Sequence, residues 1–247
     1  MTSILATPRV ALVIGGSGGI GKSIVHKLAA EGFAVAVHYS ENQASAQKLA
    51  DEIVVAGGSA IAVRGDVADE TAMTTLFDDV EQFFGGIDVV VNTAGIMILG
   101  PVADYDLEAF DLLMRTNVRG TFLVSQQAAR RVRSGGAIIN FSTTVTRTQF
   151  PNYGPYVASK AAVEGLTLVL ARELRGRDVT VNAVAPGPTA TALFLEGKDE
   201  QSIATLEKAT PLERIGAPED IAETVAFLAG PARWINGQTI FTNGGLA

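Results

Sequence analysis

Cysteine is missing from this chain of 247 residues. Its absence excludes disulfide bonds and thiolate metal sites, and it is consistent with a reducing compartment. The two histidines, His26 and His38, are too few and too badly spaced to hold a metal, so no metal site is expected. Charged residues are also scarce, at 18% against 47% hydrophobic residues, so we expect a chain with a large core rather than a disordered one.

Long apolar runs and an excess of positive charge are absent too. No stretch reaches the ~18 residues of a membrane-spanning helix, and the N-terminus shows no signal-peptide pattern. Nineteen Lys and Arg against 26 Asp and Glu give a net charge of −7, which argues against nucleic acid as a partner. We therefore expect a cytoplasmic protein with neither a nucleic-acid nor a membrane partner.

What the chain does contain is an alternation of short β-type runs with longer helical stretches. The expected strands are 10–14, 34–38, 60–64, 87–92, 137–141, 179–184 and 239–242, and the expected helices are 22–31, 42–56, 70–84, 107–133, 153–175 and 219–228. This rhythm predicts an α/β fold, a three-layer, doubly wound parallel sheet of the Rossmann type, as a single domain over residues 1–247. Residues 186–211 interrupt the rhythm and are expected to form a substrate lid.

A glycine-rich turn over residues 15–21 follows the first expected strand and opens the first expected helix. Glycine allows a pyrophosphate to approach the backbone and the helix N-terminus closely, because a Cβ would block it. The turn fits two spacings, G-x-G-x-x-G from Gly16 or G-x-x-x-G-x-G from Gly15. Both predict a dinucleotide site, and a turn that merely connects the strand to the helix is the alternative.

The end of the second expected strand bears on the kind of dinucleotide. An NAD enzyme usually carries an acid there to hold the adenosine ribose, but this chain has Tyr39 followed by Ser40. A 2′-phosphate is then not repelled, and Ser40 could donate to it. No Arg or Lys lies in this run, and Glu41 opposes a phosphate if it turns inward. NADP(H) is favoured, and NAD(H) stays possible.

A proton-transfer pair is indicated in the helix at 153–175. Tyr156 and Lys160 are four residues apart and share a helix face. A nearby ammonium favours tyrosinate, so the phenol could exchange a proton closer to neutral pH. Thr143 follows the fifth strand at the carboxyl edge of the sheet, where ligands of such folds bind. Ser142 beside it is expected to point to the other side of the strand, which favours Thr143.

Together these segments resemble the short-chain dehydrogenase/reductase family over nearly the whole chain. The family's motifs occur in order at Ile14-Gly15 to Gly21, Asp66-Val67, Asn92-Thr93-Ala94-Gly95, Thr116-Asn117-Val118, Thr143, Tyr156 with Lys160, and Pro186-Gly187 with Thr189. The resemblance implies the catalytic residues Asn117, Thr143, Tyr156 and Lys160. It also implies cofactor contacts from Gly15, Ser17, Gly18, Gly19, Ile20, Gly21, Tyr39, Ser40, Asp66, Val67, Asn92, Ala94, Gly95, Tyr156, Lys160, Pro186, Gly187 and Thr189.

The resemblance also implies how these residues act. Tyr156 would give its proton to the carbonyl oxygen, and Thr143 would hydrogen-bond that oxygen. Lys160 would hold the nicotinamide ribose and lower the pKa of Tyr156. Asn117 would position a water, and Thr189 would hold the carboxamide.

Four positions depart from the family pattern. Ile14 stands where a Thr usually ties the glycine turn to the Asn-Asn-Ala-Gly segment, and Thr93 replaces the second Asn of that segment. These two changes are expected to weaken a structural hydrogen bond. Gly18 stands where many NADPH-dependent relatives have Arg, and Thr143 replaces Ser but keeps the hydroxyl.

Several further features have two interpretations. The arginines at 130, 131, 133, 172, 175 and 177 could dock an acidic acyl carrier protein or could be solvated helix ends. The leucines at 193, 195, 206 and 212 and Phe194 could line a substrate pocket or pack the lid, and Trp234 is expected in the core or at a subunit contact. The helices at 107–133 and 153–175 resemble the family's dimer-forming pair, so the resemblance implies a homotetramer.

The predicted function is hydride transfer between NADP(H) and a carbonyl or secondary alcohol, with a ketone, aldehyde or 3-oxoacyl thioester as substrate. Two alternatives stay open. One is an NAD-dependent dehydrogenase of alcohols, polyols or steroids. The other is a nicotinamide-binding redox sensor without turnover.

Overall fold

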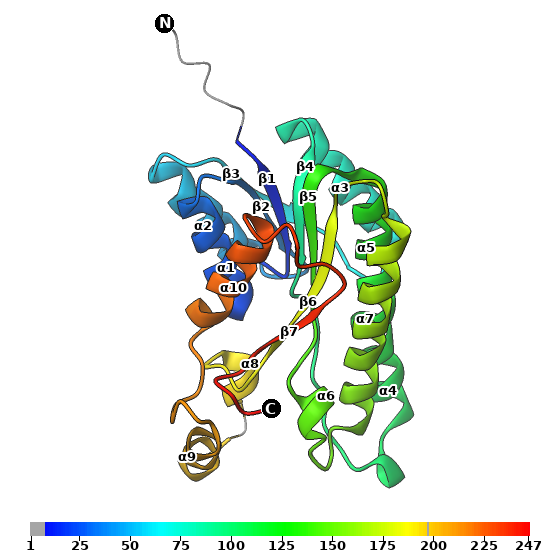
Figure 1. Ribbon diagram of the computed structural model, residues 1–247, viewed down its shortest axis with the longest axis vertical. Coiled ribbons are helices and arrows are strands. Elements are labelled where there is room, and N and C mark those ends of the chain that lie inside the picture. The colour runs from blue at the N-terminus through cyan, green and yellow to red at the C-terminus, as the bar shows by residue number, and fades with distance from the viewer. Residues whose placement is uncertain (1–7, 197) are drawn as a thin grey trace, which may run out of the picture.

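The strands of the protein form one parallel sheet. The computed structural model describes residues 8–196 and 198–247. Within them the sheet has seven strands in the order β3-β2-β1-β4-β5-β6-β7, each paired in parallel with its neighbours (Figure 1). The strands are β1 (Val10–Ile14), β2 (Ala34–Tyr39), β3 (Ala60–Arg64), β4 (Ile87–Asn92), β5 (Val132–Phe141), β6 (Thr180–Pro186) and β7 (Thr239–Thr242). This arrangement confirms the predicted fold class, and its order reverses between β1 and β4, where such sheets bind ligands.

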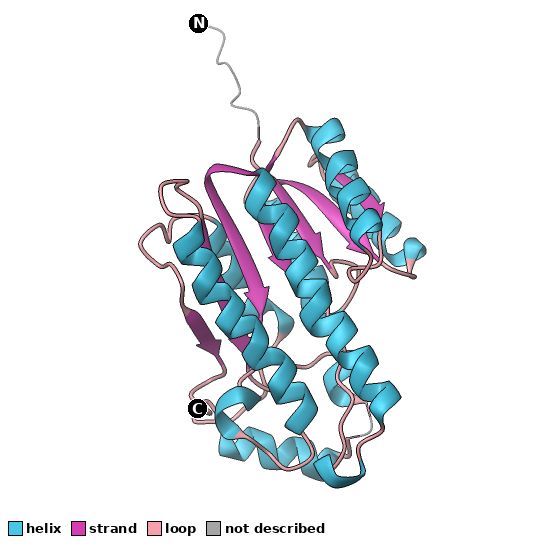
Figure 2. Cartoon of the chain, turned by 90° about the vertical axis from the view of Figure 1, so that its right-hand side faces the viewer, coloured by secondary structure: helices cyan, strands magenta, loops and turns pink. Residues whose placement is uncertain are grey.

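Helices cover both faces of the sheet because the side chains of each strand alternate between the faces. In β1, Ala11 and Val13 pack on one side, while Val10, Leu12 and Ile14 pack on the other. The first side is covered by α1 (Gly19–Ala30), α2 (Gln43–Val55) and α10 (Pro218–Ala229). The second is covered by α3 (Glu70–Phe84), α5 (Gly120–Arg131) and α7 (Gly154–Glu173), which Figure 2 shows lying over the strands.

The helix expected at 107–133 is interrupted and ends early. It consists of α4 (Leu107–Met114), a π-helical turn over Arg115–Arg119 and α5. The backbone remains helical through Gly120, so the π turn is an insertion within a continuous rod. Strand β5 then begins at Val132, five residues before its expected start, and its register against β4 shifts between Ile87 and Val89.

The C-terminal edge of the sheet carries most of the irregular chain. Here lie a single 3₁₀ turn over Val102–Asp104, α6 (Val145–Thr148), α8 (Ala192–Leu195) and α9 (Glu200–Ala209). Residues 186–211 thus form two short helices, and a bridge between Thr189 and Gly216 anchors their start. Gly197, within this segment, lies outside the described residues, as do residues 1–7 of the predicted domain.

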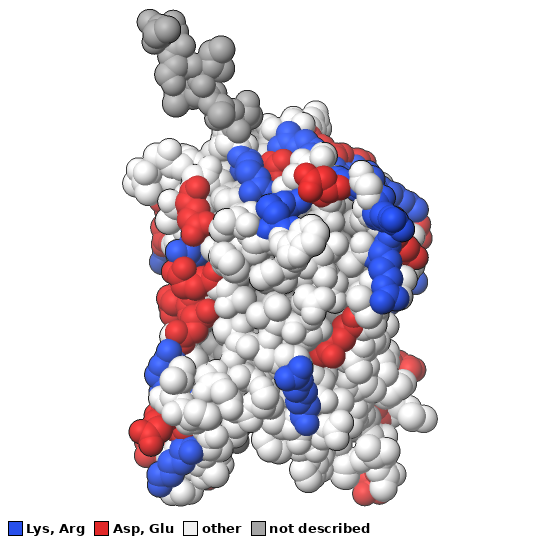
Figure 3. Space-filling model, viewed as in Figure 1, with Lys and Arg blue, Asp and Glu red and all other residues white. Residues whose placement is uncertain are grey.

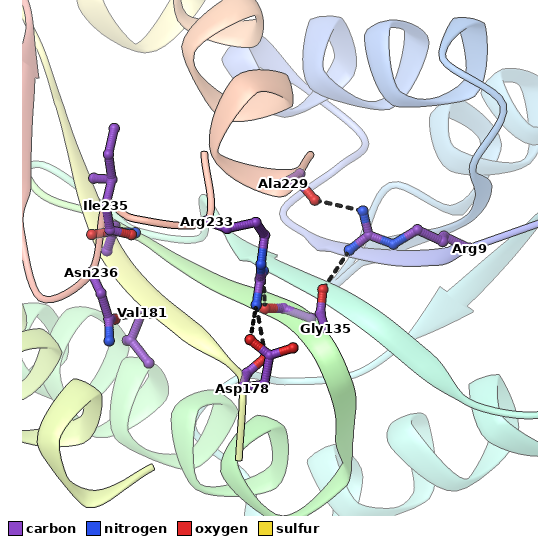
Figure 4. Close-up of polar contacts among 10 residues, drawn as sticks. Arg9, Gly135, Asp178, Val181, Ala229, Arg233, Ile235 and Asn236 are labelled. Atoms are coloured by element: carbon purple, nitrogen blue, oxygen red, sulfur yellow. Dashed lines mark hydrogen bonds and ion pairs between the residues drawn. The ribbon is translucent and has the colours of Figure 1, made fainter. Parts of the chain in front are cut away.

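The opposite edge of the sheet is held by arginine side chains (Figure 4). Arg9 donates to the carbonyl oxygens of Ala229 at 2.8 Å and Gly135 at 3.2 Å. Arg233 donates to the Gly136 carbonyl at 2.9 Å and to both the carbonyl and the carboxylate of Asp178. These contacts, which we call the arginine network, connect the start of β1, the end of α10, the first half of β5 and the loop before β6.

Two global expectations can be checked directly. Trp234 is 100% exposed, so its expected place in the core is wrong. In the part of the chain that the structure describes, no helix combines the length and apolar character that crossing a membrane requires.

Candidate active site

The glycine turn between β1 and α1 fits only one of the two spacings. Gly15 and Gly19 have positive φ angles of +75° and +49°, which favour glycine. A Cβ on Gly21 would overlap the Gly15 carbonyl oxygen. Gly18 is the N-cap of α1, supplies no side-chain cap and has open space around its Cα. The G-x-x-x-G-x-G spacing is therefore the structural one, and it leaves the first turn of α1 uncapped for an anion.

His38 supports this turn from β2. Its Nδ1 accepts a hydrogen bond of 3.0 Å from the Gly15 N–H, and its Nε2 lies 2.9 Å from the Gly65 carbonyl oxygen. Because a carbonyl can only accept, Nε2 carries the proton and the ring is neutral. Burial lowers the pKa of His38 to about 4. Sequence reasoning considered His38 only as a metal ligand and missed this role.

Thr93 compensates for Ile14. Its Oγ1 donates to the Ile14 carbonyl oxygen at 2.8 Å, and its backbone N–H donates to the same oxygen at 2.9 Å. The expected weakening of the tie between the glycine turn and the segment after β4 is therefore wrong. The hydroxyl is supplied by Thr93, directly after β4, instead of by the last residue of β1, and the hydrogen bond between the two segments is kept.

The carboxyl ends of β1 to β4 enclose a cavity of about 720 Å³, here called the cofactor cavity. Most of the predicted cofactor residues line it, namely Gly15, Ser17, Gly18, Gly19, Ile20, Gly21, Tyr39, Ser40, Asp66, Val67, Ala94 and Gly95. Two arginines that sequence reasoning did not consider, Arg64 and Arg115, also line it. Arg115 is paired with Asp66 at 2.6 Å.

A second cavity of about 200 Å³ adjoins the first and is here called the substrate cavity. The two share walls at Ile20, Thr93, Gly95, Ile96, Phe141, Thr191 and Leu193. The remaining predicted contacts that line the substrate cavity are Thr143, Tyr156, Lys160, Pro186, Gly187 and Thr189. The predicted proton-transfer residues therefore line a cavity that shares walls with the cofactor cavity.

Tyr156, Thr143 and Lys160 come together at the end of β5. The Tyr156 phenol lies near the Thr143 hydroxyl, and burial raises the pKa of Tyr156 to about 12 although that hydroxyl opposes the shift. Lys160 Nζ donates to the Phe141 carbonyl at 3.0 Å and lies 5.9 Å from the Tyr156 ring centre. Burial lowers the pKa of Lys160 to about 8. The pKa of Tyr156 thus moves opposite to the expected direction, and the phenol is protonated at neutral pH.

Two of the predicted site residues line neither cavity. Asn117, in the π turn, is fully buried and its amide brackets Ile96, accepting from the backbone N–H and donating to the carbonyl, both at 2.9 Å. The same amide donates to Ser159 Oγ at 3.0 Å. Asn92 is buried and donates to Thr121 Oγ1 at 3.2 Å. The side chain of Asn92 therefore lines neither cavity, and its predicted cofactor contact stays a prediction.

The substrate cavity is mostly apolar. Among the described residues that line it, Lys160 is the only charged one, and Met97, Val145, Phe150, Leu193 and Phe194 are among the apolar ones. The Phe150 and Tyr153 rings pack edge to face, and so do the Tyr153 and Tyr156 rings. From the expected lid, Leu193, Phe194 and Leu206 line the cavity, whereas Leu195 and Leu212 do not.

The basic clusters lie at the other end of the molecule. Arg131 is paired with Asp78 and Glu81, and Arg133 with Asp88. Arg177 donates to two backbone carbonyls. Figure 3 shows basic side chains gathered at the end where the strands begin, away from the cavities at their carboxyl ends. Arg131, Arg133 and Arg177 therefore make contacts within the fold.

Comparison with known proteins agrees with the fold and the cavities. A family model described as enoyl-(acyl carrier protein) reductase matches residues 15–247. A short-chain type dehydrogenase/reductase of Picea abies is 43% identical, with 96% of this chain and 92% of that protein covered. An NADPH-dependent aldehyde reductase of Arabidopsis thaliana is 40% identical, with 96% and 93% covered.

A solved structure gives the same result. A short-chain dehydrogenase from Burkholderia cenocepacia, in complex with NADP, has a TM-score of 0.91, 38% identity and 98% coverage of both chains. The parallel sheet with its dinucleotide cavity defines a nucleotide-dependent oxidoreductase. Within that class, the chain belongs to the short-chain dehydrogenase/reductase family.

Proposed function

We propose that the protein uses NADPH to reduce the carbonyl group of a small, uncharged ketone or aldehyde, with Tyr156 as the proton donor. The observation that carries this proposal is the position of the Tyr156 phenol, which is buried, protonated at neutral pH and near Thr143 in a cavity that shares walls with the cofactor cavity. A protonated phenol can donate the proton that carbonyl reduction consumes, whereas alcohol oxidation requires a group that can accept a proton.

The glycine turn fits the dinucleotide, since its uncapped helix start and its missing side chains leave room for a pyrophosphate. When bound, NADPH supplies the hydride. Tyr156 then gives its proton to the carbonyl oxygen, and Thr143 holds that oxygen by a hydrogen bond. Lys160 would hold the nicotinamide ribose, Thr189 the carboxamide, and Asn117 would position the loop at Ile96 and a water near Lys160.

The apolar lining of the substrate cavity supports an uncharged substrate. An anionic group placed there would lose its hydration and would find only Lys160 as a cation. The names of relatives agree with this class, since one is an aldehyde reductase. A carrier-bound 3-oxoacyl thioester is less well supported. Arg172 lies on α7 about 24 Å beyond Tyr156, at about 1.5 Å per residue, so a carrier docked there would be far from the cavity.

The first test follows NADPH absorbance with a panel of neutral aldehydes, ketones and 3-oxoacyl thioesters. We expect turnover of the neutral carbonyl compounds. Tyr156→Phe should lower kcat by at least about 100-fold while the Kd for NADPH is unchanged, because only the proton is lost. Tight NADPH binding with no turnover of any compound would instead support a redox sensor. A preference for NADH with alcohols would support the NAD-dependent dehydrogenase.

The preference for NADPH is proposed to rest on Arg64. In β3, Ala60 and Ala62 pack on the same side as Tyr39, so Arg64, two residues further, points to that side. Arg64 pairs in register with Tyr39 and lines the cofactor cavity beside Ser40. Among the residues that the structure describes, Arg64 has no ion-pair partner. It supplies the cation that the second strand lacks for a 2′-phosphate.

Arg64→Gln should weaken NADPH binding about tenfold to a hundredfold and leave NADH binding unchanged, because a charge-assisted bond to the 2′-phosphate is lost. Arg115→Gln is the matched control. Arg115 lines the same cavity but is paired with Asp66, so its loss should affect both nucleotides alike. Both Kd values can be measured by fluorescence titration. An equal effect of Arg64→Gln on NADPH and NADH would refute this role.

The assembly and location are also proposals. Large apolar side chains are exposed along the helices expected to form subunit contacts, with Leu112 at 49%, Phe122 at 50% and Val169 at 51%. Such a surface supports a homo-oligomer, and the family resemblance favours a tetramer. The absence of cysteine is consistent with the cytoplasm.

A further inference from the structure

Three side chains of α7 bind the three residues that end β5 and begin the turn after it. Lys160 bonds to the Phe141 carbonyl, and the Tyr156 phenol lies near the Thr143 side chain. Between them, Glu164 binds Ser142. The three α7 residues are four positions apart, so they follow one another along one side of the helix. Two of them have proposed roles in the reaction, and Glu164 has none so far.

Glu164 holds the chain on both sides of Thr143 through one oxygen atom. Its Oε1 accepts a hydrogen bond of 2.5 Å from Ser142 Oγ and lies 2.9 Å from Thr146 Oγ1. Thr146 Oγ1 also lies 2.9 Å from the Thr143 carbonyl oxygen, so its single proton is shared between two acceptors. Ser142 is 4% exposed and Thr143 8% exposed, whereas Glu164 and Thr146 are half-buried, so these bonds form where the buried end of β5 meets the surface.

This arrangement changes the meaning of Ser142. Strand β5 ends at Phe141, and backbone bonds from Ser142 to Val184 and from Thr144 to Pro186 continue its pairing with β6. The Ser142 hydroxyl bonds to Glu164, whereas the Thr143 hydroxyl lies near Tyr156 and accepts from the Val145 N–H at 3.3 Å. Two adjacent hydroxyls thus have different partners on the same helix.

We propose that Glu164 is a positioning residue that acts through Ser142 and Thr146 to aim the Thr143 hydroxyl at the reacting oxygen. This inference rests on the proposed function of Thr143. Glu164 lines neither cavity, so it has no contact with substrate or nucleotide of its own. Its anchor is α7 itself, which also carries Tyr156. The two groups that must meet the same carbonyl oxygen are therefore held by one rigid element.

The test is a double-mutant cycle of Glu164→Leu with Thr143→Ala, using a carbonyl compound that the wild-type protein reduces. Glu164→Leu should lower kcat about tenfold and leave the Kd for NADPH unchanged, because misplacement of Thr143 affects only the reacting oxygen. In the Thr143→Ala background, Glu164→Leu should change kcat by less than about twofold. Glu164→Gln is the matched control and should keep most activity, since its amide oxygen can still accept both bonds.

Additive losses in the cycle would overturn the proposal, as would a parallel fall in kcat and NADPH affinity. If Glu164→Leu does not fold, Ser142→Ala and Thr146→Val each remove one bond to Glu164 and should each lower kcat with the Kd for NADPH unchanged. Full activity in both would equally overturn it. Wild-type turnover is measured first. Its absence would count against the proposed function, whereas turnover with additive losses would count against Glu164 alone.

Discussion

His38 shows how much a single buried ring can contribute to the cofactor cavity. Through its two nitrogens it connects the glycine turn after β1 with the turn after β3. The bond from the Gly15 N–H requires the neutral ring, because a proton on Nδ1 would face that N–H, whereas Nε2 donates to the Gly65 carbonyl in either state. Protonation therefore breaks the contact with Gly15, and burial lowers the pKa of His38 to about 4 to prevent it.

The pKa of His38 predicts a pH dependence of stability. The folded protein binds the proton less readily than the unfolded chain, so the free energy of unfolding falls as the pH drops from 6.5 towards 4. Between pH 7 and pH 5 this group should cost roughly 2 kcal/mol. Urea unfolding at both pH values would measure it. His38→Gln does not titrate there and should show a correspondingly smaller fall, whereas an equal fall in both proteins would contradict the assignment.

At the scale of elements, the helix from 107 to 131 shows what a π turn achieves. Asn117 lies in the middle of the π turn over Arg115–Arg119. Its amide bonds to the backbone of Ile96, which lines both cavities. Helix α7 acts similarly, because it brings Tyr156, Lys160 and Glu164 to the end of β5. Each element presents its functional groups from a backbone held by packing on the sheet.

The elements were predictable from the sequence because their signals are local. Apolar runs and helical spacing predicted β1, β3, α3, β4 and β7 with their observed bounds. The predicted start of β5 was wrong, because the register shift against β4 and the φ of +84° at Gly135 interrupt the alternation of side chains that marks a strand. The π turn was not predicted either, because its residues are compatible with an ordinary α-helix.

The site was predictable where one short segment carries its residues, and unpredictable where the fold brings distant residues together. Tyr156 and Lys160 share a helix turn and were identified. Arg64 and His38 serve the cofactor cavity from neighbouring strands, and their role depends on strand order. Glu164 acts on Ser142 across 22 residues. The predicted direction of the Tyr156 pKa shift was also wrong, because burial, which spacing cannot reveal, raises that pKa.

At the scale of the whole molecule, the two edges of the sheet have different tasks. The cavities lie at the carboxyl ends of the strands, and the arginine network of Arg9 and Arg233 lies at their amino ends. Arg233→Ala should remove about 1 to 2 kcal/mol of stability and lower Tm by roughly 3 to 6 °C, because its bonds to Gly136 and Asp178 are lost. Calorimetry would measure the shift.

The same variant should keep kcat and KM within about twofold, since no residue of the network lines either cavity. A large loss of activity at temperatures well below Tm would show that the two edges are coupled. Arg233→Lys, which keeps the charge but not the forked geometry, is a suitable comparison and should fall between the two proteins in Tm.

The arginine network has one further consequence. Its hydrogen bonds stabilise the amino ends of the strands, and none of its residues lines either cavity. Thermal stability and turnover are therefore properties that mutation can change separately. Substitutions in the substrate cavity that alter specificity but reduce stability can then be offset by stabilising substitutions in the arginine network during evolution.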